Sequence, residues 1–316
     1  MTLANLITDF LEYLELERNT SQLTIKNYDH YLKRFLEFAR LASQAKQAHD
    51  IKPSDIDLNL IRKYRLHLSR WSDPKTQKPL KRVTQNYFMI ALRAFLRYLA
   101  RIDIDSLSPE KVELGETDPS PLKVLDDTHL KSLLDAPDTT KKDGIRDRAI
   151  LETLFSTGLR VSELASLNKD TINLNRKEFG VIGKGGKERV VFISDSAAEW
   201  IQKYLDVRHD TFKPLFIRFQ GKVNSENNGE AMRLTSRSIE RVVEKYVKVL
   251  GLSVKATPHT LRHSFATDLL INGADIRSVQ EMLGHSNIAT TQIYTHVTNA
   301  HLKDVHKAFH SGNNKD

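Results

Sequence analysis

Six side chains in the C-terminal half of the sequence are of the types that chemistry on a phosphodiester requires. They are two arginines, a lysine, two histidines and a tyrosine, namely Arg160, Arg262, Lys184, His259, His285 and Tyr294. Guanidinium groups bind phosphate oxygens in pairs and stay charged at neutral pH, so they can stabilise the charge that grows on a five-coordinate phosphorus. The set therefore indicates phosphoryl transfer that needs no metal.

The tyrosine and the lysine suit complementary tasks in such a reaction. A phenol, with a pKa of about 10, is a weak nucleophile until a base or nearby cations activate it. The departing sugar oxygen needs a proton, which a lysine with a lowered pKa can supply. Tyr294 follows His285 with no other ionisable side chain between them, and Lys184 lies in "GKGGKE", a stretch typical of a tight hairpin turn.

Each of these motifs has a simpler interpretation when it stands alone. "GLR" is common at helix ends, "GKGGKE" can be a solvated turn, and Tyr294 alone would fit a core or interface aromatic. The Walker spacing and the HExxH zinc motif are both absent from the sequence. We interpret five further histidines as structural or surface residues: His263, His296, His301, His306 and His310.

The composition favours a soluble protein with a polyanionic partner. The 316 residues suffice for two domains, and 40% hydrophobic residues can supply their cores. The formal charge is +8 and the pI is about 9.4, which fits nucleic-acid binding. The lack of cysteine excludes disulfides and thiolate catalysis. There is no signal-peptide pattern or apolar run of membrane length, so we expect a cytoplasmic protein without membrane contact.

Helical periodicity dominates the first hundred residues. Apolar residues recur at three- and four-residue spacing, which predicts helices within 1–19, 20–40, 53–71 and 83–102. Thr20 or Ser21 is the expected N-cap of the second helix, and Pro53 and Ser54 are expected at the start of the third. Ten cations are predicted on exposed helix faces, where together they suit phosphate binding: Lys26, Lys33, Arg34, Arg62, Lys63, Arg65, Lys81, Arg82, Arg93 and Arg97.

The remainder of the chain shows a linker followed by a mixed pattern. Residues 106–123 hold three prolines without helical rhythm, which is typical of a linker. Strands are predicted at 171–174, 178–183 and 188–194, and a polar loop at 220–234. Helices are predicted at 126–136, 143–158, 195–208, 235–250, 258–272, 275–283 and 299–310.

Taken in order, "GLRVSEL", "GKGGKER", "HTLRHSFAT" and "LGHSNIATTQIYTH" resemble the motifs of the tyrosine recombinase/integrase family, and its Xer-type members most of all. The resemblance covers the whole chain. It implies a mainly α fold with a small antiparallel β-sheet. Residues 1–105 would form a helical, SAM-like core-binding domain that contacts DNA. After the linker, residues 124–316 would form an α+β catalytic domain that ends in a helix for docking on the next protomer.

The resemblance also implies a role for each candidate residue. Arg160 and Arg262 match the two arginines that clamp the scissile phosphate, and Glu163 matches an acidic residue that supports the site. Lys184 matches the lysine that acts as general acid and protonates the leaving 5′ oxygen. His259 matches the residue that takes part in proton transfer at the nucleophile. Two residues remain: His285 matches the second histidine on the phosphate, and Tyr294 the nucleophile.

The implied activity is site-specific recombination of DNA through a 3′-phosphotyrosine intermediate, with no cofactor and no metal. Implied partners are a double-stranded recombination site, a homo- or hetero-tetramer on two synapsed sites, a sister recombinase and a DNA translocase. The implied task is resolution of chromosome or plasmid multimers. Three alternatives stay open: an integrase or transposase of a mobile element, a nicking-closing enzyme like a type IB topoisomerase, and a non-catalytic DNA-binding protein.

Two features bear on the choice within the family. We expect no arm-binding domain before residue 1, which favours a Xer-type resolvase over a phage integrase. The 220–234 loop is longer than the compact Xer pattern needs, and we expect a contact with DNA or a partner, or a tolerated insertion.

Overall fold

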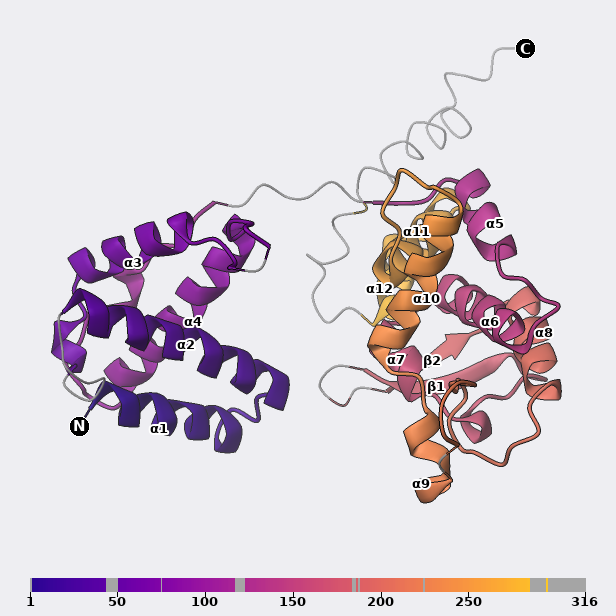
Figure 1. The fold of residues 1–316 in the computed structure, drawn as a ribbon, viewed down its shortest axis with the longest axis horizontal. Coiled ribbons are helices and arrows are strands. Elements are labelled where there is room, and N and C mark those ends of the chain that lie inside the picture. Colours follow the sequence, from indigo (N-terminus) through magenta and orange to yellow (C-terminus); the bar gives the residue numbers. More distant parts are fainter. Residues whose placement is uncertain are drawn as a thin grey trace, which may run out of the picture. The chain divides into compact units, whose positions relative to one another are not determined.

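The chain divides into two compact units, residues 1–120 and 121–316 (Figure 1). The structure, a computed structural model, describes residues 2–43, 51–74, 76–116, 123–183, 186, 188–223, 225–284 and 294. The predictions for Lys184, for His285 and for a helix at 299–310 lie outside these residues. Within the described ranges, no helix has the length and apolar character that crossing a membrane demands.

Four helices build the first unit. They are α1 (Leu3–Leu16), α2 (Gln22–Ala42), α3 (Leu58–Arg70) and α4 (Arg82–Arg101). Their apolar faces meet in one core, in which α4 contacts the other three helices. Ser21 caps α2 by accepting a hydrogen bond from the backbone of Thr24, as the sequence predicted. The periodicity of the sequence therefore located all four helices, because each buries one stripe.

The start of the third helix was predicted wrongly. Pro53 and Ser54 belong to a separate 3-10 turn, Pro53–Asp55, and α3 begins at Leu58. Asp57 is the true N-cap, since its side chain accepts a hydrogen bond of 2.7 Å from the backbone of Leu60. Further along, in the segment predicted as a linker, a second 3-10 turn (Pro109–Lys111) leads to Val112, which is buried in the core of this unit.

Exposure of the ten cations was predicted correctly for seven of them. Lys26, Lys33, Arg62, Lys63, Lys81, Arg82 and Arg97 are exposed, but Arg34, Arg65 and Arg93 are half-buried. The guanidinium of Arg34 lies 4.0 Å from the centre of the Trp71 ring, so aromatic packing holds it. Arg65 and Arg93 each have buried guanidinium nitrogens.

The second unit is mainly helical with one two-stranded antiparallel sheet in its described part. Its strands are β1 (Glu178–Ile182) and β2 (Glu188–Phe192), paired with Phe179 opposite Val191. Its helices are α5 (Asp127–Asp135), α6 (Lys142–Thr157), α7 (Val161–Ser166), α8 (Asp195–Asp206), α9 (Glu226–Gly229), α10 (Ser236–Val249), α11 (Pro258–Ile271) and α12 (Ile276–Leu283). The fold class predicted from the sequence is confirmed.

Helix α6 forms the centre of this unit. It packs against α5, α8, α10, α11 and β2, and most of its residues from Ala149 to Thr157 are buried. A helix that is covered on several sides shows no narrow apolar stripe, and in α6 the polar residues Asp147 and Glu152 are buried together with apolar ones. Its C-terminal end is consequently a fixed point from which the next segment starts.

Two local predictions in this unit need correction. Residues 171–174 form no strand, because Lys169–Thr171 is a 3-10 turn and Asn173 pairs with Glu178 only as an isolated bridge. The side chain of Asn173 accepts a hydrogen bond from the backbone of Arg176, which closes a turn there instead. The predicted loop at 220–234 contains the short α9, in which Asn227 and Asn228 have left-handed backbone angles, and a 3-10 turn, Glu230–Met232.

Candidate active site

Gly158 sets the position of Arg160 by ending α6 two residues earlier. It ends α6 in the left-handed conformation (φ 59°), and a Cβ atom there would lie 2.4 Å from the ring of Phe265. Glycine alone avoids both the strain and the clash. Two residues later Arg160 is the N-cap of α7.

Glu163 ties Arg160 down in two ways. The backbone N–H of Arg160 donates to Oε2 of Glu163 at 2.8 Å, and its Nη1 donates to Oε1 at 2.9 Å. A carboxylate in the first turn of a helix also satisfies an otherwise unpaired amide. Glu163 is 7% exposed, whereas the side chain of Arg160 remains 28% exposed and can reach a ligand. Glu163 therefore contacts Arg160 through both its backbone and its side chain.

Arg262 approaches the same place from α11. Thr257 caps that helix, and Pro258 opens it at the start predicted from the sequence. The buried guanidinium of Arg262 donates from Nη1 to the carbonyl of Gly158 at 2.5 Å and from Nη2 to that of Leu283 at 2.7 Å. Burial, and then the charge of Arg160, lower the pKa of Arg262 to about 10. Arg262 is thus still a cation at neutral pH, with a fixed orientation.

Arg189 is a member of this cluster that the sequence analysis did not single out. It projects from β2, and its two Nη atoms donate to the two oxygens of Glu163 at 3.0 and 2.9 Å. Burial alone would raise the pKa of Glu163, but hydrogen bonds from Arg189 and Arg160 outweigh it and lower that pKa to about 2. The available signal was the last letter of "GKGGKER", an arginine within a half-buried strand.

Tyr294 is fully buried in a small cluster against α11 and α12. Its neighbours are Ala266, Leu270, Val279 and Leu283. Burial raises the pKa of the Tyr294 hydroxyl to about 12, although the charge of Arg262 works in the opposite direction. In this position the phenol is neutral and has no solvent-accessible surface. The nucleophilic role predicted for Tyr294 would require its hydroxyl to leave this cluster.

His263 touches the predicted nucleophile. Its Nδ1 lies 2.6 Å from the hydroxyl oxygen of Tyr294. Burial, followed by the charges of His259 and Arg262, lowers the pKa of His263, so the neutral ring is favoured and Nδ1 can accept the hydroxyl proton. His263, interpreted from the sequence as a structural or surface residue, is thus half-buried and in contact with Tyr294. Its spacing of four from His259, one helical turn, was the signal that could have found it.

His259 is in a different environment from Arg262. His259 is exposed, at the edge of a cavity of about 490 Å³ between α10 and α11, whereas Arg262 is 4% exposed. Arg237, Glu240 and Lys255 also line this cavity. The described residues therefore bring Arg160, Glu163 and Arg262 into one network, with Tyr294 against the same helix as Arg262 and His259 at the start of that helix. Among the residues that the structure describes, no three histidines or carboxylates gather as a metal site would require.

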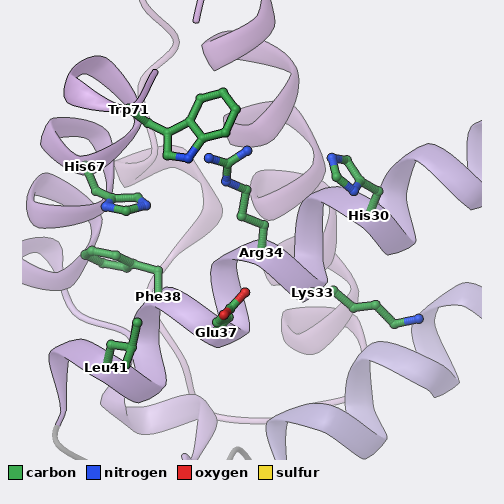
Figure 2. Close-up of a pocket in the computed structure, with 8 residues that line it drawn as sticks. All are labelled: His30, Lys33, Arg34, Glu37, Phe38, Leu41, His67 and Trp71. Atoms are coloured by element: carbon green, nitrogen blue, oxygen red, sulfur yellow. The ribbon is translucent and has the colours of Figure 1, made fainter. Parts of the chain in front are cut away.

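A separate concavity lies in the first unit, between α2 and the end of α3. Figure 2 shows the guanidinium of Arg34 beneath the indole of Trp71, with the rings of Phe38 and His67 beside them. The cavity measures about 450 Å³, and Lys33 and Glu37 stand at its border. Since Arg34 also lies 5.3 Å from the Phe88 ring, its charge is turned toward aromatic faces.

Known proteins resemble this chain over nearly its full length. The model of the phage integrase family matches residues 123–301, and that of the phage integrase N-terminal SAM-like domain matches residues 7–102. Tyrosine recombinase XerD of Lacticaseibacillus casei is 38% identical over 312 residues, which cover 96% of this chain and 98% of that protein. Tyrosine recombinase XerC of Pelotomaculum thermopropionicum is 37% identical over 316 residues, covering 96% and 97%.

Solved structures show the same fold. The Tn1549 transposon integrase in complex with transposon right end DNA aligns with a TM-score of 0.70 at 19% identity, over 96% of this chain and 99% of that one. The XerH site-specific recombinase bound to its difH substrate aligns with a TM-score of 0.66 at 22% identity, over 96% and 84%.

These matches define the class of the protein. The chain belongs to the phage integrase family, the tyrosine recombinases, and its relatives in sequence are Xer recombinases. It is an enzyme of the tyrosine-type site-specific recombinases, with an N-terminal SAM-like domain and a C-terminal integrase domain.

Proposed function

We propose that this recombinase cuts and rejoins double-stranded DNA with Tyr294 as its nucleophile. Attack on the scissile phosphate would join the phenolic oxygen to phosphorus and break the bond to the 5′ oxygen, which leaves as a hydroxyl. The product is a 3′-phosphotyrosine, and a 5′-hydroxyl of a partner strand reverses the step. Because the bond energy is kept in the intermediate, the exchange consumes no nucleotide.

The observation that carries this proposal is the convergence of two guanidinium groups on the end of α12. Nη2 of Arg160 lies 3.2 Å from the carbonyl oxygen of Gly284, and Nη2 of Arg262 lies 2.7 Å from that of Leu283. Two cations held on adjacent carbonyls suit the non-bridging oxygens of one phosphate. His285 is the next residue in the sequence, and Tyr294 packs on Leu283.

We assign the remaining roles as the family resemblance implies. Lys184, on the connection between β1 and β2, would protonate the 5′ oxygen, and His285 would bind the phosphate. His259, exposed at the start of α11, would take part in proton transfer at the nucleophile. Glu163 would hold Arg160 in place through the contacts given above.

The wider assembly is also part of the proposal. The seven predicted cations that are exposed in the first unit would bind DNA phosphates. Recombination of two sites would take place in a cytoplasmic tetramer of this chain, alone or with a sister recombinase. A translocase would bring the sites together during resolution of chromosome or plasmid multimers at cell division. The DNA-bound integrase and XerH complexes support DNA as the partner.

A nicked suicide substrate tests the nucleophile. The wild-type protein should be trapped on DNA through a bond to the 3′ end, and the adduct should map to Tyr294. Tyr294→Phe should remove the adduct completely and keep DNA binding, because only the hydroxyl is lost. Tyr87→Phe, at an exposed tyrosine of the first unit, is the matched control and should form the adduct normally. An adduct on the Tyr294→Phe protein would show that the nucleophile lies elsewhere.

A further inference from the structure

Three arginines from three different elements bind three successive carbonyls at the end of α12. Helix C-termini leave carbonyls unpaired and carry partial negative charge, so cations there are stabilising. Gly284 ends the helix in the left-handed conformation (φ 64°). The pairs are Arg189 Nε with Met282 at 3.1 Å, Arg262 Nη2 with Leu283 at 2.7 Å and Arg160 Nη2 with Gly284 at 3.2 Å.

Arg189 differs from the other two arginines because it grips both oxygens of the Glu163 carboxylate. Nε binds the α12 carbonyl while both Nη atoms grip the carboxylate of Glu163, which also holds Arg160. Its side chain is 11% exposed, against 28% for Arg160. The planar guanidinium satisfies a carbonyl and a carboxylate at once, which a lysine ammonium cannot reproduce. All three guanidinium nitrogens of Arg189 therefore bind Glu163 or α12.

Gly284 provides an independent sign that the end of α12 is built around Arg189. A Cβ atom at Gly284 would lie 3.0 Å from Cδ of Arg189 and 3.1 Å from its Nη1. Together with the positive φ, this close approach of Arg189 disfavours residues with a Cβ atom and favours glycine at position 284. The side chain of Arg189 thus links β2 to α12. The connection from β1 to β2 carries Lys184, and His285 follows α12 in the sequence.

We propose that Arg189 is a positioning residue for the recombination reaction. It fixes Glu163, and through Glu163 the guanidinium of Arg160, at a set distance from the last turn of α12. It touches no substrate itself. The inference rests on the proposed function, in which Arg160 binds the scissile phosphate. Small displacements of such a group are costly, since a misplacement of about 1 Å can reduce a rate by about a hundredfold.

The test compares Arg189→Lys with the wild type in single-turnover cleavage of the nicked substrate. The lysine keeps the charge but loses the three-point contact, so cleavage should slow by about tenfold to a hundredfold while the dissociation constant for DNA stays unchanged. Arg176→Lys is the matched control: its side chain, 73% exposed, pairs with Glu178 at the base of β1, and cleavage should be unaffected.

A second substrate separates positioning from a merely structural role. A methylphosphonate at the scissile position removes the phosphate charge that Arg160 would bind. The penalties of Arg189→Lys and of Arg160→Ala should both shrink on it, because both act through that charge. A fold defect would slow both substrates equally. Equal penalties on the two substrates, or wild-type cleavage by Arg189→Lys, would overturn the inference. Failure of the wild-type protein to form an adduct would instead refute the proposed function.

Discussion

Arg34 of the first unit and the arginine cluster at the end of α12 in the second unit are held in opposite ways. In the first unit, Arg34 packs its guanidinium between the rings of Trp71 and Phe88. In the second unit, Arg160, Arg189 and Arg262 are held by a carboxylate and by backbone carbonyls. Aromatic faces stabilise a cation without directing its N–H groups, whereas hydrogen bonds fix the plane and the direction of the fork.

This difference separates arginines that support a fold from arginines that are prepared for a ligand. A guanidinium aligned by several acceptors loses little orientational freedom when it meets a transition state, so its remaining donors act at full strength. Arg34 has the same charge without such alignment. The comparison predicts that the same Arg→Lys change will slow catalysis at the cluster in the second unit, whereas at Arg34 in the first unit it will leave catalysis unchanged and affect only stability.

The largest expected effect distinguishes Arg262 from Arg34. Arg262→Lys should reduce single-turnover cleavage by about 10²–10³, because the paired contact with a phosphate is lost. It should also lower the free energy of unfolding, since the carbonyls of Gly158 and Leu283 lose their donor at a cost of about 1–3 kcal/mol. Arg34→Lys should cleave at the wild-type rate. Equal cleavage rates for the two variants would contradict the distinction.

A smaller effect concerns the stability that Glu163 contributes and its dependence on pH. Its pKa falls from 4.5 to about 2 on folding, so the ionised carboxylate stabilises the folded state above its ordinary pKa. That contribution, at most about 3 kcal/mol, is lost as the pH falls from about 4.5 toward 2. Glu163→Gln should therefore be less stable at pH 7, and the difference should narrow in acid.

Denaturant unfolding between pH 7 and pH 3 measures this dependence. Glu240→Gln is the matched control, because Glu240 pairs with Arg237 at the surface of the same unit. An exposed pair contributes about 0–1 kcal/mol, so the control should change little at any pH. A gap between wild type and Glu163→Gln that stays constant down to pH 3 would mean that the carboxylate charge is not what stabilises the cluster.

The smallest effect concerns the exposed cations of the first unit. Lys26→Gln and Arg82→Gln should each reduce the slope of log affinity against log salt by about 1, if that side chain neutralises a DNA phosphate. Arg34→Gln should leave the slope unchanged and cost about 0.5–1 kcal/mol of stability through the lost contact with Trp71. A reduced slope for Arg34→Gln would place it among the phosphate-binding residues and end the contrast between the units.

The sequence alone determined the class of the protein and most of its elements. Helices with one apolar stripe, such as α1 and α4, could be placed from periodicity, because each buries a single face. The sequence motifs alone predicted that Arg160, Glu163 and Arg262 belong to one site. Their spacing reflects local geometry: a helix-ending glycine, an N-cap and one helical turn.

Only the tertiary structure decided how these segments meet. The contact of Arg189 with Glu163 joins residues 26 positions apart, and that of His263 with Tyr294 joins residues 31 apart. Such contacts depend on how α11, α12 and β2 pack, and periodicity within one element carries no information about its neighbours. For the same reason the sequence could not show that Tyr294 lies buried, with its pKa raised to about 12, instead of facing a phosphate.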